Sequence, residues 1–110
     1  MNISHVISSI DISSGGPARS VTHLIEGMLF NNKEIKIELN TLKSPNTIIR
    51  KFKSRNGTIN FHDHGFFTNS KSLKKRLNVL NSDIYHGHGL WQLPVHKMAK
   101  LAKRQNKPYI

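Results

Sequence analysis

The 110-residue sequence contains no cysteine, no long apolar run and few acidic or aromatic residues. Without cysteine, the chain has no disulfide scaffold, thiol nucleophile or zinc ribbon. No apolar run approaches the ~20 residues that span a bilayer. The opening residues also lack the basic start of a signal peptide. We therefore expect a cytoplasmic protein, and at this length one compact domain fits while two do not.

The scarcity of acidic side chains leaves the chain strongly basic. Seventeen Lys and Arg stand against six Asp and Glu, which gives a formal net charge of +11. Such an excess favours an anionic partner: nucleic acid, acidic lipid or a phosphorylated substrate. A small nucleic-acid-binding module stays open as an alternative, but no RRM, KH or helix-turn-helix pattern supports it. The basic groups at 50–55, 71–76 and 97–107 would form one positive face if they converge.

Hydrophobic periodicity predicts alternating strands and helices. Short β-prone stretches bounded by turn residues alternate with apolar residues at helical spacing. We expect strands at 2–8, 35–39, 58–61, 83–88 and 107–110, and helices at 17–30, at 70–80 and from 94. The strand at 35–39 alternates apolar and charged residues, so we expect it to be half exposed. The alternation indicates an α/β fold: a Rossmann-like parallel sheet with helices on both faces.

A Gly15-Gly16-Pro17 turn joins the first expected strand to the first expected helix. In open α/β sheets, ligands bind at the carboxyl ends of strands, and a helix N-terminus favours an anion. Glycines also let the backbone approach a ligand closely. The turn is therefore a candidate phosphate or carboxylate site. A tight strand–helix connection explains it equally well, since neither Gly-x-Gly-x-x-Gly nor a P-loop lysine is present.

Two His-x-His pairs raise the question of a metal. His62 and His64 form one pair and His86 and His88 the other, and residues two apart on a strand share a face. Each pair could chelate one ion, as in a metal-dependent hydrolase, but no third ligand follows at a recognisable spacing. We therefore expect one functional histidine at a strand end and no metal. Trp91 is either a cover for the sheet edge or an aromatic wall for a sugar or base.

The first of two longer motifs is His-Val-Ile-Ser-Ser at 5–9, followed by Ser-Gly-Gly-Pro-Ala-Arg at 14–19. The second is Asp-Ile-Tyr-His-Gly-His-Gly-Leu-Trp at 83–91. In this order the two motifs resemble family-4 glycosyltransferases of the GT-B fold, in which the second stretch reads Asp-hydrophobic-hydrophobic-His-x-His-Gly-hydrophobic-Trp. Gln-Leu-Pro at 92–94 and Lys-Pro-Tyr-Ile at 107–110 also fit. The middle of the chain matches only loosely, as the acceptor-facing region of such enzymes varies.

The resemblance implies two Rossmann-like domains that face a cleft. The N-terminal domain mainly binds the acceptor, and the C-terminal domain binds the nucleotide-sugar donor and carries a pair of glutamates. The enzymes transfer sugar with retention of configuration and need no metal. Gly15 and Gly16 then correspond to the loop that approaches the donor diphosphate, and His88 to the active-site histidine that hydrogen-bonds the transferred sugar. Further sugar or acceptor contacts are expected at Arg19, Trp91 and Gln92.

By this resemblance, residues 1–110 are an incomplete N-terminal acceptor-side domain, a truncated part of a GT-B enzyme. The donor-binding domain and its glutamates are absent from the sequence. We therefore expect this polypeptide alone to be inactive and the activity to belong to a longer parent. That parent would be a retaining hexosyltransferase that builds polysaccharide or a lipid-linked glycan from a nucleotide-sugar. Its basic charge suits an anionic membrane surface, so we expect peripheral attachment at the inner face of the plasma membrane.

Overall fold

A computed structural model of the chain describes residues 1–63, 70–89 and 93–110. Within that part, the elements alternate as the sequence predicts and their ends differ from the expected ones by at most three residues, except that no strand forms at 107–110. In chain order they are β1 (Asn2–Ile7), the short 3-10 helix η1 (Ile12–Ser14), α1 (Gly16–Asn31), β2 (Lys36–Leu42), β3 (Gly57–His62), α2 (Lys71–Val79), β4 (Ile84–His88) and α3 (Leu93–Gln105).

The described strands form one all-parallel sheet in the order β3-β2-β1-β4. On the outer side of β4, Tyr109 makes an isolated parallel bridge to Tyr85, in place of the strand expected at 107–110. The order therefore reverses between β1 and β4. The chain adds β2 and then β3 on one side of β1, and afterwards crosses back to add β4 on the other side of β1. Such a reversal opens a crevice beyond the carboxyl ends of the two strands. The predicted α/β class is confirmed, and the sheet is compatible with a Rossmann-like fold.

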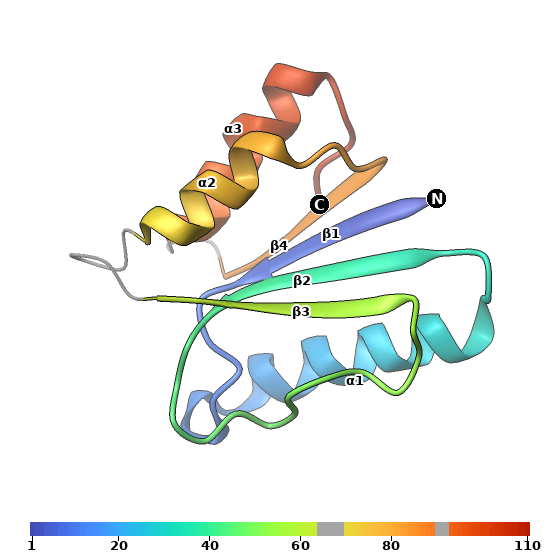
Figure 1. Cartoon of the computed structure of the whole chain (residues 1–110), viewed down its shortest axis with the longest axis vertical. Helices are drawn as coiled ribbons and strands as arrows, with labels where there is room; N and C mark the ends of the chain where they lie inside the picture. Colours follow the sequence, from blue (N-terminus) through green and yellow to red (C-terminus); the bar gives the residue numbers. More distant parts are fainter. Residues whose placement is uncertain (64–69, 90–92) are drawn as a thin grey trace.

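Helices cover both faces of the sheet, as predicted (Figure 1). α1 lies on one face, and α2 and α3 lie side by side on the other. Each layer has its own apolar core. The α1 side is built mainly from Ile3, Ile7, Val21, Ile25, Leu29, Ile37 and Leu39. The α2/α3 side is built from Val6, Leu73, Leu77, Tyr85, Val95, Met98 and Leu101.

The predicted alternation of buried and more exposed residues at 35–39 is confirmed, but β2 runs on to Leu42 and its later residues are buried. Lys36 is exposed and Glu38 half-buried, whereas Asn40 and Thr41 have an exposed fraction of 0%. The reason is the strand's place in the sheet: β2 pairs with β1 and β3 and has helices over both faces. The alternation therefore holds only at the start of a central strand that is covered on both sides farther along.

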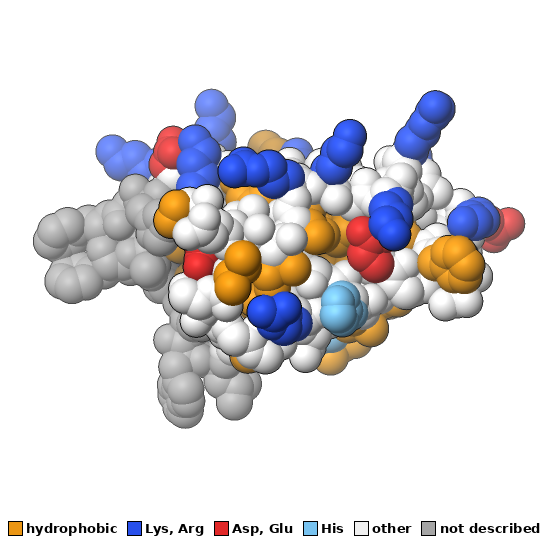
Figure 2. Space-filling model, turned by 90° about the horizontal axis from the view of Figure 1, so that it is seen from below, with side chains coloured by type: hydrophobic (Ala, Val, Ile, Leu, Met, Phe, Trp, Pro, Cys, Tyr) orange, Lys and Arg blue, Asp and Glu red, His pale blue; other side chains and the backbone are white. Residues whose placement is uncertain are grey.

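The basic groups do not converge on one face. Residues 50–55 lie on the α1 side, where Phe52 enters the core and the Lys53 amide donates to Glu26 of α1. The groups at 71–76 and 97–107 belong to α2 and to α3 with the residues after it, on the opposite side of the sheet. Figure 2 looks onto the α1 side and shows Lys and Arg along one edge with acidic side chains among them. By contrast, α2 and α3 contain no acidic residue.

Gly87 gives a test of how β4 packs against α3. A methyl group at this position would collide with the hydroxyl of Tyr109 and lie 2.7 Å from Cγ1 of Val95. Tyr109 is held there, because its hydroxyl donates to the Val95 carbonyl at 3.1 Å. We expect Gly87→Ala to lower the free energy of unfolding by roughly 1–3 kcal/mol, the usual range for overpacking. Urea denaturation followed by circular dichroism measures the change.

The matched control is Gly27→Ala in the middle of α1. A methyl group there would meet no atom of residues 1–63, 70–89 or 93–110 within 4 Å. Alanine should therefore stabilise that helix by roughly 0.5–1 kcal/mol through its better helix propensity. If Gly87→Ala were as stable as the unmodified chain, Tyr109 and Val95 could not lie against the strand as described.

Candidate functional site

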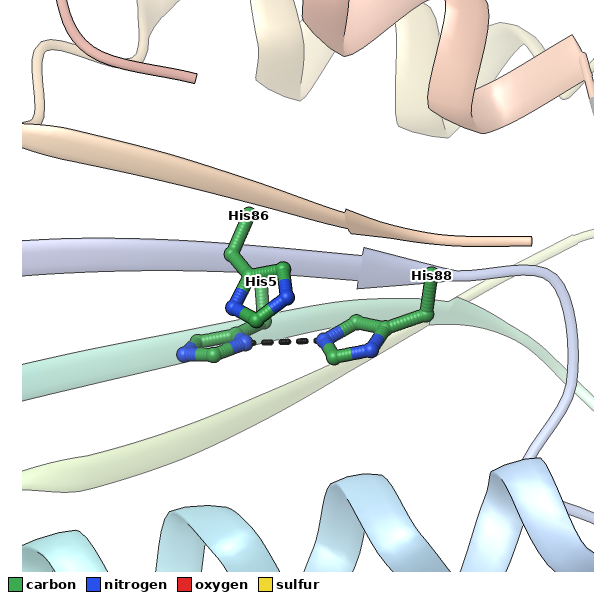
Figure 3. Close-up of side chains that lie close together, drawn as sticks. All are labelled: His5, His86 and His88. Atoms are coloured by element: carbon green, nitrogen blue, oxygen red, sulfur yellow. Dashed lines mark hydrogen bonds between the residues drawn. The ribbon is translucent and has the colours of Figure 1, made fainter. Parts of the chain in front are cut away.

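Three histidines come together where β1 and β4 run side by side. His5 of β1 pairs directly with His86 of β4, and His88 lies opposite Ile7 at the end of both strands. His5 lies between Ile3 and Ile7, and these side chains face α1. The three imidazoles therefore project from one face of the sheet toward the α1 layer, as Figure 3 shows. We call His5, His86 and His88 the histidine cluster.

The cluster is closely packed. Nδ1 of His5 and Nε2 of His88 lie 3.0 Å apart and share a hydrogen bond. His86 stacks on His88 with ring centroids 4.2 Å apart, and its ring centroid lies 4.9 Å from that of His5. His5 is 1% exposed, whereas His86 and His88 are half-buried. The cluster thus runs from the core to the surface.

Burial keeps these imidazoles neutral. It lowers the pKa of His5 to about 3, with His86 and His88 adding charge repulsion. Burial, together with the repulsion from His86, lowers the pKa of His88 to about 4. The pKa of His86 is also lowered by burial. At neutral pH the cluster therefore offers uncharged rings that donate or accept hydrogen bonds.

A metal site needs a third ligand beside His86 and His88, and the sequence did not reveal one. The cluster supplies it in the imidazole of His5. One nitrogen from each ring can be chosen so that all three lie within 4.8 Å of one another. Neutral imidazole is the form that binds zinc. However, the facing nitrogens of His5 and His88 share a proton in their hydrogen bond. Their lone pairs are therefore not both available to one ion in this arrangement.

The glycine turn lies at the same edge of the sheet as the histidine cluster. Gly15 and Gly16 follow β1 through η1, and β1 ends opposite His88. Gly15 has φ +72°, a left-handed conformation that favours glycine, and a methyl group on either glycine would meet none of the described residues within 4 Å. Within the described part of the chain, no side chain caps the N-terminus of α1 at Gly15. The turn is therefore exposed and carries the partial positive charge of a helix N-terminus.

Gly16 comes after β1 and His88 is the last residue of β4, so both lie beyond or at the carboxyl ends of neighbouring parallel strands. Arg19 lies in the first turns of α1 and is exposed. Trp91 and Gln92, the other predicted contacts, lie outside the described residues, as does His64.

His62 belongs to a different group from the histidine cluster. It is on β3, and its ring bonds to Asn40 at 2.7 Å and to Ser72 of α2 at 2.6 Å. Asn40 in turn donates to Glu38, which forms a two-point ion pair with Arg76. This network ties β2 and β3 to α2, so His62 has a structural role in the described chain.

No motif or spacing in the sequence singled out His5 as a site residue. It appeared only as the first residue of the N-terminal motif, and no spacing links it to a residue 83 positions later. One signal was present: His5 is a polar side chain between Ile3 and Ile7 in a strand with apolar alternation. A polar residue on an otherwise apolar strand face needs a partner when buried, which marks it as a candidate.

The neutral state of the cluster predicts how stability depends on pH. His5 has a folded pKa below the unfolded value near 6.5, so its contribution is present above pH ~6.5 and is lost as the pH falls toward 3. Between these values the unfolded chain binds one more proton at this site, which contributes a fall in stability of about 1.4 kcal/mol per pH unit. Burial of His88 adds to the same slope, so His5→Leu should make the slope shallower by about the contribution of one site without removing it. Urea denaturation between pH 6.5 and 5 measures it.

The control is His23→Ala, on the exposed side of α1. This variant should keep the slope of the unmodified chain. An unchanged slope in His5→Leu would contradict the burial of an uncharged imidazole at position 5.

Comparisons with known proteins add no family. No protein-family model matches the chain, and no curated protein matches it.

Proposed function

We propose that the chain is the N-terminal, acceptor-side part of a retaining glycosyltransferase of the GT-B type. The parent protein transfers a sugar from a nucleotide-sugar to a cell-surface glycan or a lipid-linked acceptor. The observation that carries the proposal is the position of the Gly15-Gly16 turn and His88 at one edge of a parallel sheet. This edge lies at the reversal of strand order, where open α/β sheets bind their ligands.

The two parts of this edge suit the two ends of a sugar diphosphate. The exposed, uncapped N-terminus of α1 favours a phosphate group, because its partial positive charge and backbone N–H groups face outward. His88 is uncharged and half-buried, so it can hydrogen-bond a sugar hydroxyl without placing a charge beside it. Arg19, exposed in α1, adds a cation near the turn. In this proposal the site works without a resident metal.

Activity of the parent protein tests the proposal. We expect the full protein that contains this chain to transfer sugar from one member of a panel of nucleotide-sugars, and the 110-residue chain alone to be inactive. His88→Ala in the parent should lower kcat on the order of 100-fold, as loss of a preorganised hydrogen bond in an active site does. The rate of sugar transfer to a glycan or lipid-linked acceptor is measured.

The matched control for this assay is His23→Ala, which removes an exposed imidazole from α1 that is not part of the histidine cluster. It should leave kcat unchanged. Absence of transfer from every nucleotide-sugar, or full activity of His88→Ala, would overturn the proposal.

A second part of the proposal is peripheral attachment to an anionic membrane. Among the described helices, none is long and apolar enough to cross a bilayer. The surface groove between α2 and α3 is lined by four basic side chains and by Leu77 and Leu101. The basic residues are Lys74, Lys97, Lys100 and Arg104. With no acidic residue on either helix, this groove suits acidic headgroups, and we propose that it faces the inner surface of the plasma membrane.

Vesicle co-sedimentation tests this attachment. Each Lys or Arg near an anionic surface contributes about 1 kcal/mol, so removing two should weaken binding roughly 30-fold. We expect the double variant Lys100→Glu, Arg104→Glu to lose binding to phosphatidylcholine vesicles that contain phosphatidylglycerol. The control, Lys51→Glu with Lys53→Glu on the α1 side, should keep most of it.

Salt and neutral lipid complete the vesicle experiment. Binding should be absent with pure phosphatidylcholine and should be lost at high salt. The screening length is ~8 Å at physiological ionic strength and becomes shorter as salt is added, so the attraction between the basic groove and the lipid weakens. Equal binding to both kinds of vesicle would overturn the membrane proposal. Much tighter, salt-sensitive binding to RNA would instead favour the nucleic-acid module.

A further inference from the structure

The hydrogen bond between His5 and His88 restricts where the ring protons lie. Nδ1 of His5 and Nε2 of His88 are 3.0 Å apart, so one of these two nitrogens carries a proton and the other accepts it. Both rings are neutral at pH 7, because burial lowers both pKa values well below that pH. A neutral imidazole has one N–H and one bare nitrogen. Only two arrangements of the pair are therefore consistent with this bond.

The other nitrogen of His5 distinguishes the two arrangements. His5 is 1% exposed, and its Nε2 is buried without a hydrogen-bond partner among the described residues. If His88 donated to His5, the proton of His5 would lie on Nε2 as a buried, unpaired N–H. If His5 donates from Nδ1, its Nε2 is a bare nitrogen. Orphaned buried N–H groups are rarer in proteins than acceptors without a full set of partners, so the second arrangement is favoured.

The protonation of His88 follows from that of His5. When Nε2 of His88 accepts the bond, the single proton of its neutral ring lies on Nδ1. Figure 3 shows this second nitrogen on the side of the ring away from His5. The stacked ring of His86, with its centroid 4.2 Å from that of His88, limits rotation of the His88 ring.

We infer that His5 is a positioning residue: it holds His88 as the tautomer protonated at Nδ1, so that His88 donates a hydrogen bond to a ligand oxygen. An N–H donor of this kind recognises a hydroxyl or phosphate oxygen and cannot bind a metal ion through the same nitrogen. That the N–H group of His88 binds the transferred sugar rests on the proposed function. The tautomer of His88 is independent of that function, since it follows from the hydrogen bond to His5 and from the burial of the two rings.

Nuclear magnetic resonance of the 15N-labelled chain at pH 7 tests the inference. Long-range proton–nitrogen correlations show which nitrogen of each imidazole carries the proton. We expect His88 of the unmodified chain to carry it on Nδ1. His5→Leu, which removes the donor, should shift the proton of His88 toward Nε2. His5→Asn is the matched variant, because its amide N–H₂ lies near the place of Nδ1 and should keep the proton of His88 on Nδ1.

Some outcomes would overturn the inference. One is a His88 protonated at Nε2 in the unmodified chain, and another is the same His88 tautomer in a folded His5→Leu. If His5→Leu does not fold, the spectra of the unmodified chain and of His5→Asn decide. Stoichiometric binding of added zinc chloride through His5 and His88 would also overturn it, because a metal-bound pair cannot share a proton.

The parent enzyme separates this inference from the proposed function. There, His5→Leu should lower kcat more than it changes KM, and His5→Asn should restore it. A parent without transferase activity would remove the role of His88 on a sugar, whereas the spectra alone decide whether His5 sets the tautomer.

Discussion

The pairing of β1 with β4 is the constraint on which the candidate site depends. It joins strands whose hydrogen-bonded histidines, His5 and His88, are 83 residues apart in the sequence. The pairing sets Ile7 opposite His88 and so brings the Gly15-Gly16 turn and the histidine cluster to one edge of the sheet. If the register between β1 and β4 shifted by one residue, His86 and His88 would point to the other face of the sheet, away from His5, and the cluster would not form.

The His86-Gly87-His88 triplet serves both faces of β4 at once. Its histidines face the α1 layer, where they meet His5. Its glycine faces α3, where Tyr109 and Val95 fill the space that a side chain would occupy. Alternation along a strand makes this division obligatory, since neighbouring residues point to opposite faces. The triplet therefore combines a packing requirement with a polar site: packing against α3 explains the glycine, and the contacts with His5 explain the two histidines.

Polar side chains are buried on both faces of the sheet, and they find their hydrogen-bond partners in a different way on each face. On the α2 side, burial opposes the charge on Glu38, but hydrogen bonds from Arg76 and Asn40 outweigh burial and lower its pKa. On the α1 side, the histidines lose their charge and pair with each other. The first solution fixes α2 on the sheet. The second leaves two uncharged, half-buried hydrogen-bonding rings, His86 and His88, near the carboxyl end of β4.

The sequence by itself determined the elements and their type, because apolar periodicity and turn residues are local signals. It also placed Gly16 and His88 at strand ends, and parallel connections then put both at one edge. Only the tertiary structure decided strand order, and with it the burial of Asn40 in a central strand, the separation of the basic groups onto two faces and the partnership of His5 with His88. These depend on which distant segments become neighbours, and no local pattern encodes that choice.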